Sequence, residues 1–173
     1  LALVNTGAFR DDLPTSFLAS SETVQKRPGN GTVGPYDLVK GDCPIMMPFG
    51  NTIESVDVSS AELYTMAVWA VAGEIPFGSS LAVGLQGQIR GVSVSATMYP
   101  NLTVHVTDVS WPDGSPVDRL LTTDRHQMAL SSFLSSGGDG CPIPLRPLRK
   151  TAIDDATAMC AAIASSNGLI HQE

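Results

Sequence analysis

Positive charge is scarce in this sequence. Ten Lys and Arg residues stand against 17 Asp and Glu residues, which gives a formal net charge of -7. A protein that binds the phosphate backbone of a nucleic acid needs a basic surface, so this balance argues against a nucleic-acid partner. The sequence also lacks an apolar run of about 18 residues, the length that a helix needs to cross a bilayer. We therefore expect neither a nucleic-acid partner nor a transmembrane segment.

Cysteine is rare as well, with only Cys43, Cys141 and Cys160 present. An odd count leaves two options open: one disulfide with one free thiol, or a partner cysteine outside this chain. A bridge between Cys43 and Cys141 is among the open pairings. The sequence has no Cys-x-x-Cys or Cys/His spacing of the kind that binds zinc, and its three His residues lie far apart. We predict no metal ligand within this chain.

The sequence has no start methionine and no leader with a basic end and a cleavage site. Residues 1–4 instead have the apolar pattern of a strand from the first residue. We therefore expect a mature product, a proteolytic piece or a partly traced chain. Two acceptor sequons for N-glycosylation, at Asn30 and Asn101, lie in loop-like contexts. Such sequons favour an exported glycoprotein, although they also arise by chance.

What the sequence does contain suits a folded domain: 43% of its 173 residues are hydrophobic and 16% are charged. The apolar patterns indicate strands at 1–4, 53–58, 89–98 and 102–109, and helices at 34–39, from 59 or 60 to about 71, and from about 153 to 164. In the second strand we expect Ile53, Val56 and Val58 to be the apolar set, and Glu54 and Asp57 to face water. Helices and hairpins are mixed, so the fold class is α/β or mixed α+β.

The helix that begins at residue 59 or 60 has two local signals. A serine suits the capping position at its start, and Glu62 places an acid in its first turn. Trp69 extends the apolar face of this helix or lies at its rim. That face is predicted to consist of Leu63, Met66, Ala67 and Ala70.

A glycine-rich stretch near residue 138 is the strongest candidate for a binding loop. Gly137, Gly138 and Gly140 surround one carboxylate, so the backbone there can adopt positive φ and approach another group closely. Phe133 offers a flat apolar face, and Asp139 offers a hydrogen-bond acceptor. Together they suit a planar molecule that carries hydrogen-bond donors. The alternative is an ordinary glycine-rich turn that follows a core phenylalanine.

A second candidate region follows the first strand. Asn5 and Arg10 bracket a turn centred on Gly7, and ligands often bind at such a strand end in α/β sheets. Arginine grips a phosphate or carboxylate through two parallel hydrogen bonds. The alternative for Arg10 is a surface ion pair with Asp11 or Asp12, which is the commoner role of a lone arginine.

A third segment, 47–51, places Phe49 between Pro48 and Gly50, on a bend; the simplest alternative role for this ring is core filling. Segments 5–10, 47–51 and 133–140 occur in the order and approximate spacing of one family. On these segments, nearly the whole chain resembles the C-terminal domain of the 5'-nucleotidases, the group that includes UDP-sugar hydrolases and ecto-5'-nucleotidase. The resemblance implies that family's fold, with sheets covered by helices.

The resemblance also implies a role for each candidate residue. Phe49 and Phe133 match the two aromatic residues that sandwich the nucleobase, an arrangement that suits any purine or pyrimidine. Asp139 matches the acid that accepts hydrogen bonds from the ribose hydroxyls. Asn5 matches a polar contact on the base side of the site, and Arg10 matches a phosphate-binding arginine. The implied ligand is a nucleotide or nucleoside.

The resemblance has limits. The family's catalysis belongs to an N-terminal metallophosphatase domain with two divalent metal ions, which activates water against the phosphate. Residues 1–173 match only the C-terminal domain without its first segment, so this fragment alone is not expected to be catalytic. Cys141 replaces a usual aromatic residue, and Thr6 and Ala8 replace glycines, which puts ligand specificity in doubt.

The expected role is therefore the nucleotide-recognition part of a secreted, periplasmic or cell-surface 5'-nucleotidase, with the metallophosphatase domain as its partner. The substrate is a nucleotide, with a nucleotide sugar or cyclic nucleotide as variants. The alternative is a non-catalytic structural or interaction glycoprotein that retains the fold, because a fold does not guarantee a function.

Overall fold

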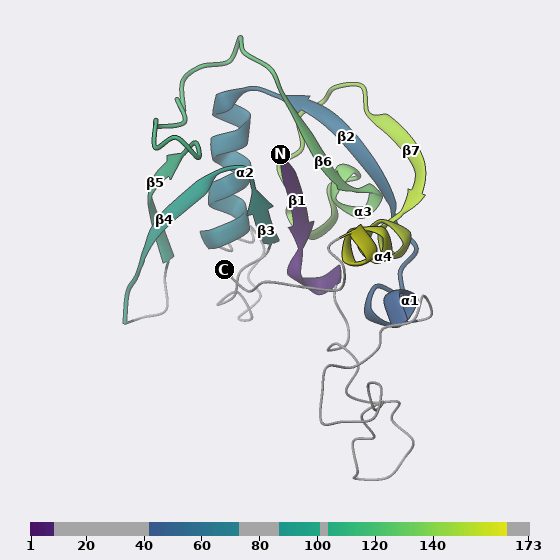
Figure 1. Cartoon of the computed structure of the whole chain (residues 1–173). Coiled ribbons are helices and arrows are strands. Elements are labelled where there is room, and N and C mark those ends of the chain that lie inside the picture. Colours follow the sequence, from purple (N-terminus) through teal and green to yellow (C-terminus); the bar gives the residue numbers. More distant parts are fainter. Residues whose placement is uncertain (9–41, 73–86, 101–103, 166–173) are drawn as a thin grey trace. The chain divides into compact units, whose positions relative to one another are not determined.

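A computed structural model of the chain describes residues 1–8, 42–72, 87–100 and 104–165 (Figure 1). The chain forms two compact units. The first contains Leu1–Gly7 and Asn51–Ala152, and the second contains Ala8–Gly50 and Ile153–Glu173. The helix expected at 34–39 lies outside the described residues. Within those residues, no helix is long and apolar enough to cross a membrane.

A five-stranded mixed sheet organises the first unit. In spatial order its strands are β3 (Gly87–Arg90), β1 (Ala2–Asn5), β6 (His126–Ser131), β2 (Thr52–Val58) and β7 (Arg149–Asp154). Strand β1 runs antiparallel to β3 and parallel to β6, and β2 runs antiparallel to β6. Because β1 lies beside β6, the turns that follow these two strands meet at one edge of the sheet. The mixed α/β class expected from the sequence is confirmed.

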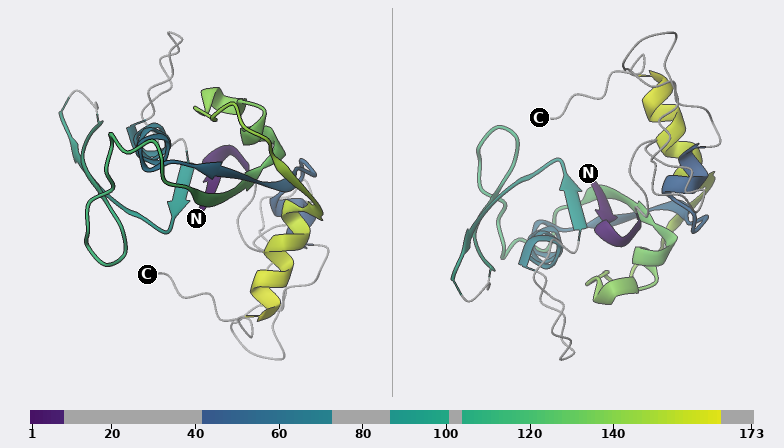
Figure 2. Two further views of the ribbon diagram at one scale, coloured as in Figure 1. Left: turned by 90° about the horizontal axis from the view of Figure 1, so that it is seen from above. Right: turned by 90° about the horizontal axis from the view of Figure 1, so that it is seen from below.

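Helix α2 (Ser60–Ala72) covers part of this sheet. Ser59 precedes it and forms a capping box with Glu62: the Ser59 N–H donates to Glu62 Oε2 at 2.7 Å, and the Glu62 N–H donates to Ser59 Oγ at 3.3 Å. The helix contacts β3, β4 and β5, and Figure 2 shows it between the β4–β5 hairpin and β1. Its predicted apolar face is confirmed, because the following side chains have no exposed surface: Leu63, Met66, Ala67 and Ala70.

The strand expected at 89–98 is two strands in two different sheets. Strand β3 ends at Arg90, and β4 (Ser93–Met98) pairs with β5 (Val104–Ser110) in a separate two-stranded sheet. The break falls at Gly91, whose φ of +94° favours glycine. A Cβ atom at Gly91 would lie 2.6 Å from Leu1 Cδ2, so a side chain here would have to displace the side chain of Leu1. Strand β7 was not expected from the sequence.

The expected exposure of Glu54 is wrong. Its side chain shares the buried face of β2 with Val56 and Val58, and only 3% of Glu54 is exposed. The Ser135 hydroxyl donates to Glu54 Oε2, and Lys150 Nζ lies 3.7 Å from Glu54 Oε1. A carboxylate tolerates burial when hydrogen bonds and a cation compensate for lost water. These partners come from distant parts of the sequence, so local alternation does not predict them.

In the second unit, helices α1 (Asp42–Met46) and α4 (Asp155–Ser165) pack together. A disulfide joins Cys43 to Cys160 across 117 positions of sequence, and Cys141 is a buried free thiol. One bridge with one free thiol was among the options left open, but the pairing of Cys43 with Cys141 is wrong. Helix α4 begins where Asp154 Oδ1 accepts from the Thr157 N–H at 2.8 Å, close to the predicted start.

Candidate functional site

The candidate binding loop begins where β6 ends. Ser131 caps helix α3 (Ser132–Ser135), because its Oγ accepts from the Leu134 N–H at 3.3 Å. The Thr52 N–H donates to Ser132 Oγ at 3.1 Å, which attaches the helix to β2. Leu134 is fully buried, whereas Phe133 is 39% exposed. These contacts fix a short helix that presents an aromatic ring at the surface.

The two glycines after α3 make room for that ring. Gly137 has a φ of +85°, and a Cβ atom at Gly138 would lie 2.5 Å from atoms of the Phe133 ring. The backbone at Gly138 therefore lies directly against the aromatic ring. The sequence predicted that the backbone of this loop approaches another group closely. In the structure, Gly138 approaches Phe133 of the same loop. Any side chain at this position would displace the ring.

Asp139 is held in an unusual conformation at the centre of the loop. Its φ of +54° is left-handed, and no other described non-glycine residue has a positive φ. Asn5 Nδ2, at the end of β1, donates to Asp139 Oδ2 at 3.1 Å. Trp69 Nε1, on helix α2, donates to the Asp139 carbonyl oxygen at 3.3 Å. Residues from three distant parts of the chain therefore meet at Asp139, where Asn5 contacts the exposed side chain and Trp69 contacts the main chain.

Asn5 contributes a buried hydrogen-bond acceptor that is not used. Only 5% of Asn5 is exposed, and its Oδ1 has no hydrogen-bond partner in the described part of the chain. A buried polar atom without a partner costs about 1–3 kcal/mol, so most such atoms in native proteins are paired. This atom lies on the side chain that contacts Asp139. A ligand that carries an N–H or O–H group would relieve the cost.

Cys141 ends the loop, and its thiol is unreactive at neutral pH. Burial, together with the nearby charge of Asp139, raises the pKa of the Cys141 thiol to about 12. The thiol therefore stays protonated at neutral pH, and the nucleophilic thiolate is not available. Its role here is packing within the core of the first unit.

The structure brings three of the five predicted binding residues together, namely Asn5, Phe133 and Asp139, on the loop and the adjoining strand end. Phe49 belongs to the second unit and is 53% exposed, so its pairing with Phe133 stays a prediction. Arg10 and the two sequon residues, Asn30 and Asn101, lie outside the described residues.

Sequence reasoning missed the part that Trp69 plays. The helical periodicity placed this residue on the apolar face of α2 or at its rim, and the side chain is 6% exposed. Its ring N–H reaches a residue 70 positions away in sequence. The only available signal was that a buried tryptophan usually needs an acceptor for its N–H.

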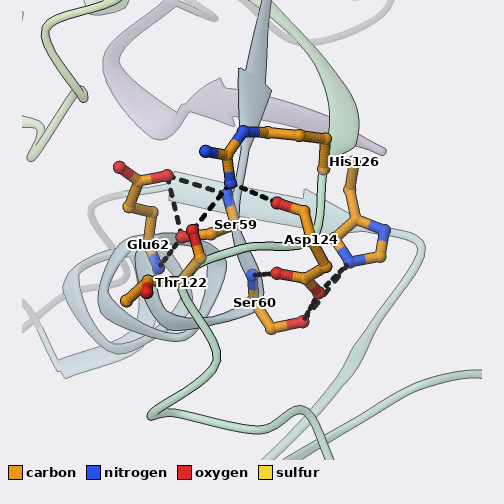
Figure 3. Close-up of polar contacts among 7 residues, drawn as sticks. Ser59, Ser60, Glu62, Thr122, Asp124 and His126 are labelled. Atoms are coloured by element: carbon orange, nitrogen blue, oxygen red, sulfur yellow. Dashed lines mark hydrogen bonds and ion pairs between the residues drawn. The ribbon is translucent and has the colours of Figure 1, made fainter.

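A second polar cluster surrounds the first turn of α2 (Figure 3). Asp124 accepts from the Ser60 N–H at 2.9 Å and from the Ser60 hydroxyl. His126 Nε2 lies 2.7 Å from Asp124 Oδ2 and 3.3 Å from Ser60 Oγ. The Ser60 hydrogen bonds, followed by those of His126, lower the pKa of the Asp124 carboxyl to about 2. The carboxylate is therefore ionised at neutral pH.

This cluster contains Ser, His and Asp but lacks the geometry of a catalytic triad. A triad uses both ring nitrogens, one toward the serine and the other toward the acid. Here a single nitrogen of His126 contacts both Asp124 and Ser60, and the Ser60 hydroxyl donates directly to the carboxylate. Ser60 is also only 3% exposed. The arrangement secures the start of α2, where an acid near the free N–H groups is stabilising.

No protein-family model matches the sequence, and no curated protein matches it. Solved structures, in contrast, do match this chain. The chain is similar to the 5'-nucleotidase precursor from Thermus thermophilus, with 18% identity and a TM-score of 0.69, over 99% of this chain and 30% of that one. The fold is one that a 5'-nucleotidase contains.

The same nucleotidase fold occurs in the NAD nucleotidase of Haemophilus influenzae. That match has 15% identity and a TM-score of 0.62, and it covers 95% of this chain and 27% of the other. The present chain therefore spans less than a third of either protein. The resemblance noted in the sequence is confirmed at the level of fold.

Proposed function

We propose that this chain is the nucleotide-recognition part of a 5'-nucleotidase-like phosphohydrolase. The Asp139 carboxylate accepts hydrogen bonds from the ribose hydroxyls, and Phe133 stacks on the base. Phe49 supplies the second ring of the sandwich, and Arg10 binds the phosphate. Asn5 contacts the base side of the site through its free acceptor.

The observation that carries this proposal is the cluster at the end of β1 and β6. Asn5, whose buried acceptor has no partner among the described residues, is hydrogen-bonded to the exposed Asp139, and the exposed Phe133 ring lies against Gly138, the residue before Asp139. A nucleoside offers a flat π-face, a pair of hydroxyl donors and, on adenine or cytosine, an amino donor. Each chemical feature of the cluster thus has a counterpart in the ligand. The nucleotidase fold supports the same interpretation.

The hydrolytic chemistry belongs, in this proposal, to a metallophosphatase domain with divalent metal ions. The described residues contain no group of three His, Cys, Asp or Glu side chains placed to hold a metal. In this proposal the chain binds and orients the nucleotide, and no catalytic step is assigned to its residues. The disulfide between Cys43 and Cys160 supports an oxidising compartment, in keeping with an exported protein that is glycosylated at Asn30 and Asn101.

Calorimetric titration of the full chain with adenosine and AMP tests the proposal. We expect binding at millimolar ligand or below, and Phe133→Ala should weaken adenosine binding about fivefold through lost stacking. Leu145→Ala is the matched control, because Leu145 is a fully exposed apolar residue of the same unit. Failure of the intact chain to bind any nucleoside at millimolar concentration would contradict the proposal and favour the non-catalytic alternative.

A further inference from the structure

We propose that Trp69 is a positioning residue for the ligand diol, acting through the main chain of Asp139. This inference rests on the proposed function, in which the Asp139 carboxylate receives the ribose hydroxyls. Trp69 itself is buried in helix α2 and contacts no ligand. Its indole N–H donates to the Asp139 carbonyl, and this contact helps to hold the backbone from which the carboxylate projects.

The conformation of Asp139 explains why such a contact is needed. An aspartate with a φ of +54° is disfavoured against ordinary helical or extended backbone, so surrounding contacts must maintain it. Within the loop, the Gly140 N–H donates to the Gly137 carbonyl and the Cys141 N–H to the Gly138 carbonyl, each at 3.1 Å. These bonds close the turn on either side of Asp139. The Gly140 N–H and the Asp139 carbonyl belong to one planar peptide unit, so the first of these bonds also helps to orient that carbonyl.

Two side chains from outside the loop complete the arrangement. Asn5 Nδ2 holds one carboxylate oxygen, and Trp69 Nε1 holds the carbonyl oxygen of the same residue. Asp139 is therefore fixed at both its side chain and its main chain. Loss of the Trp69 contact would leave the peptide unit after Asp139 held by the Gly140 N–H alone. The left-handed backbone that sets the position of the carboxylate would then be held less firmly.

The position of the Trp69 ring is itself fixed by the fold. The side chain is 6% exposed and lies in the core cluster of the first unit. A Cβ atom at Gly87 of β3 would lie 3.4 Å from Trp69 Cζ3, so β3 packs closely against the ring. A ring held between a helix and a strand aims its N–H in one direction. This rigidity is what a group that supports a binding residue requires.

The Trp69→Phe variant removes the N–H and keeps an aromatic ring. Trp111→Phe is the matched control, because the Trp111 ring lies against His126 of the other polar cluster, with 4.6 Å between ring centroids and a tilt of 50°. Each variant is titrated with adenosine and with dideoxyadenosine, which lacks both hydroxyls of the ribose diol. We expect Trp69→Phe to weaken adenosine binding about five- to tenfold and to leave dideoxyadenosine binding unchanged within about twofold. Trp111→Phe should change neither affinity.

The comparison of the two ligands separates positioning from general stability. A purely structural role of Trp69 would weaken both ligands equally, and that result would overturn the inference. Unchanged adenosine binding in Trp69→Phe would overturn it as well. If Trp69→Phe does not fold, Trp69 is replaced by benzothienylalanine in the Trp111→Phe background, where Trp69 is the remaining tryptophan. This analogue keeps the size of the indole ring system and lacks the N–H. The same selective loss of adenosine binding is then expected.

A further measurement keeps this inference separate from the proposed function. If the wild-type chain binds neither ligand, the proposed function fails. Amide hydrogen exchange at Gly140 and Cys141 then tests whether Trp69 holds the backbone of the loop. Exchange about fivefold faster in Trp69→Phe than in Trp111→Phe would support the control of the loop by Trp69. Equal exchange rates in the two variants would overturn it.

Discussion

Two aspartates of the first unit have opposite surroundings. At the start of α2, Asp124 accepts hydrogen bonds from Ser60 and lies against His126, and each of these polar groups has its partner within the cluster. At the glycine-rich loop, Asp139 is exposed, and the adjoining Asn5 carries a buried acceptor without a partner in the described chain. Hydrogen bonds that satisfy one another stabilise a fold. Unused polar groups beside an exposed ring indicate a binding site.

The same chemical change at both aspartates gives the largest expected contrast. Asp139→Asn keeps the left-handed backbone, which asparagine tolerates well, but removes the charge that receives the ligand hydroxyls. We expect adenosine affinity to fall about tenfold, since hydrogen bonds to charged groups contribute about 1.5–3 kcal/mol. The melting temperature should change by no more than about 1 °C. Calorimetry and thermal unfolding on one preparation measure both quantities.

Asp124→Asn should show the reverse pattern. The amide cannot accept from both the Ser60 N–H and its hydroxyl as the carboxylate does, and it removes the charge near the helix start. We expect the melting temperature to fall by about 3 °C while adenosine affinity stays within about twofold of wild type. If instead Asp124→Asn abolished binding without loss of stability, the distinction between the two aspartates would be wrong.

The pH dependence of unfolding stability tests the structural role of Asp124. Its carboxyl has a pKa of about 2 in the folded chain, below the ordinary value of 3.8, so the unfolded chain takes up the proton first. The stability that Asp124 contributes is therefore complete above pH 3.8 and is lost as pH falls toward 2. Chemical unfolding measured at several pH values should show a steeper loss in wild type than in Asp124→Asn. Parallel curves for the two proteins would contradict this account.

Gly138→Ala is expected to have the smallest effect, and it acts on the ring instead of the charge. The added Cβ would lie 2.5 Å from the Phe133 ring, which must rotate away. We expect adenosine affinity to fall about threefold, because only the stacking contribution of one ring is reduced. Gly114→Ala is the control, since Gly114 also has a positive φ but has open space around it. The same loss in both variants would point to backbone strain instead of ring displacement.

Local sequence signals predicted the parts of the fold that depend on neighbours in sequence. The serine at the start of α2, the glutamate in its first turn and its apolar residues three and four apart identified that helix, and the glycines around Asp139 identified the loop. The turn at Gly91 was missed because alternation continues across residues 89–98 on both sides of it. The burial of Glu54 was missed because its partners, Ser135 and Lys150, come from other elements.

The candidate site divides in the same way. Asn5, Phe133 and Asp139 were predicted as candidates because each stands beside glycines in the sequence, which is a local signal. The contact from Trp69 depends on how α2 lies against the loop, and the pairing of Cys43 with Cys160 depends on how α1 packs on α4. Both are consequences of tertiary structure, for which the sequence holds no local pattern.

We propose above that the loop of Phe133 and Asp139 binds a nucleoside. Nuclear magnetic resonance of the full chain with saturating adenosine shows directly whether the ligand lies at this loop. We predict nuclear Overhauser contacts from the base protons to the Phe133 ring and from the ribose protons to Gly138 and Gly140. Contacts confined to other parts of the chain, or no contacts at all, would contradict the claim.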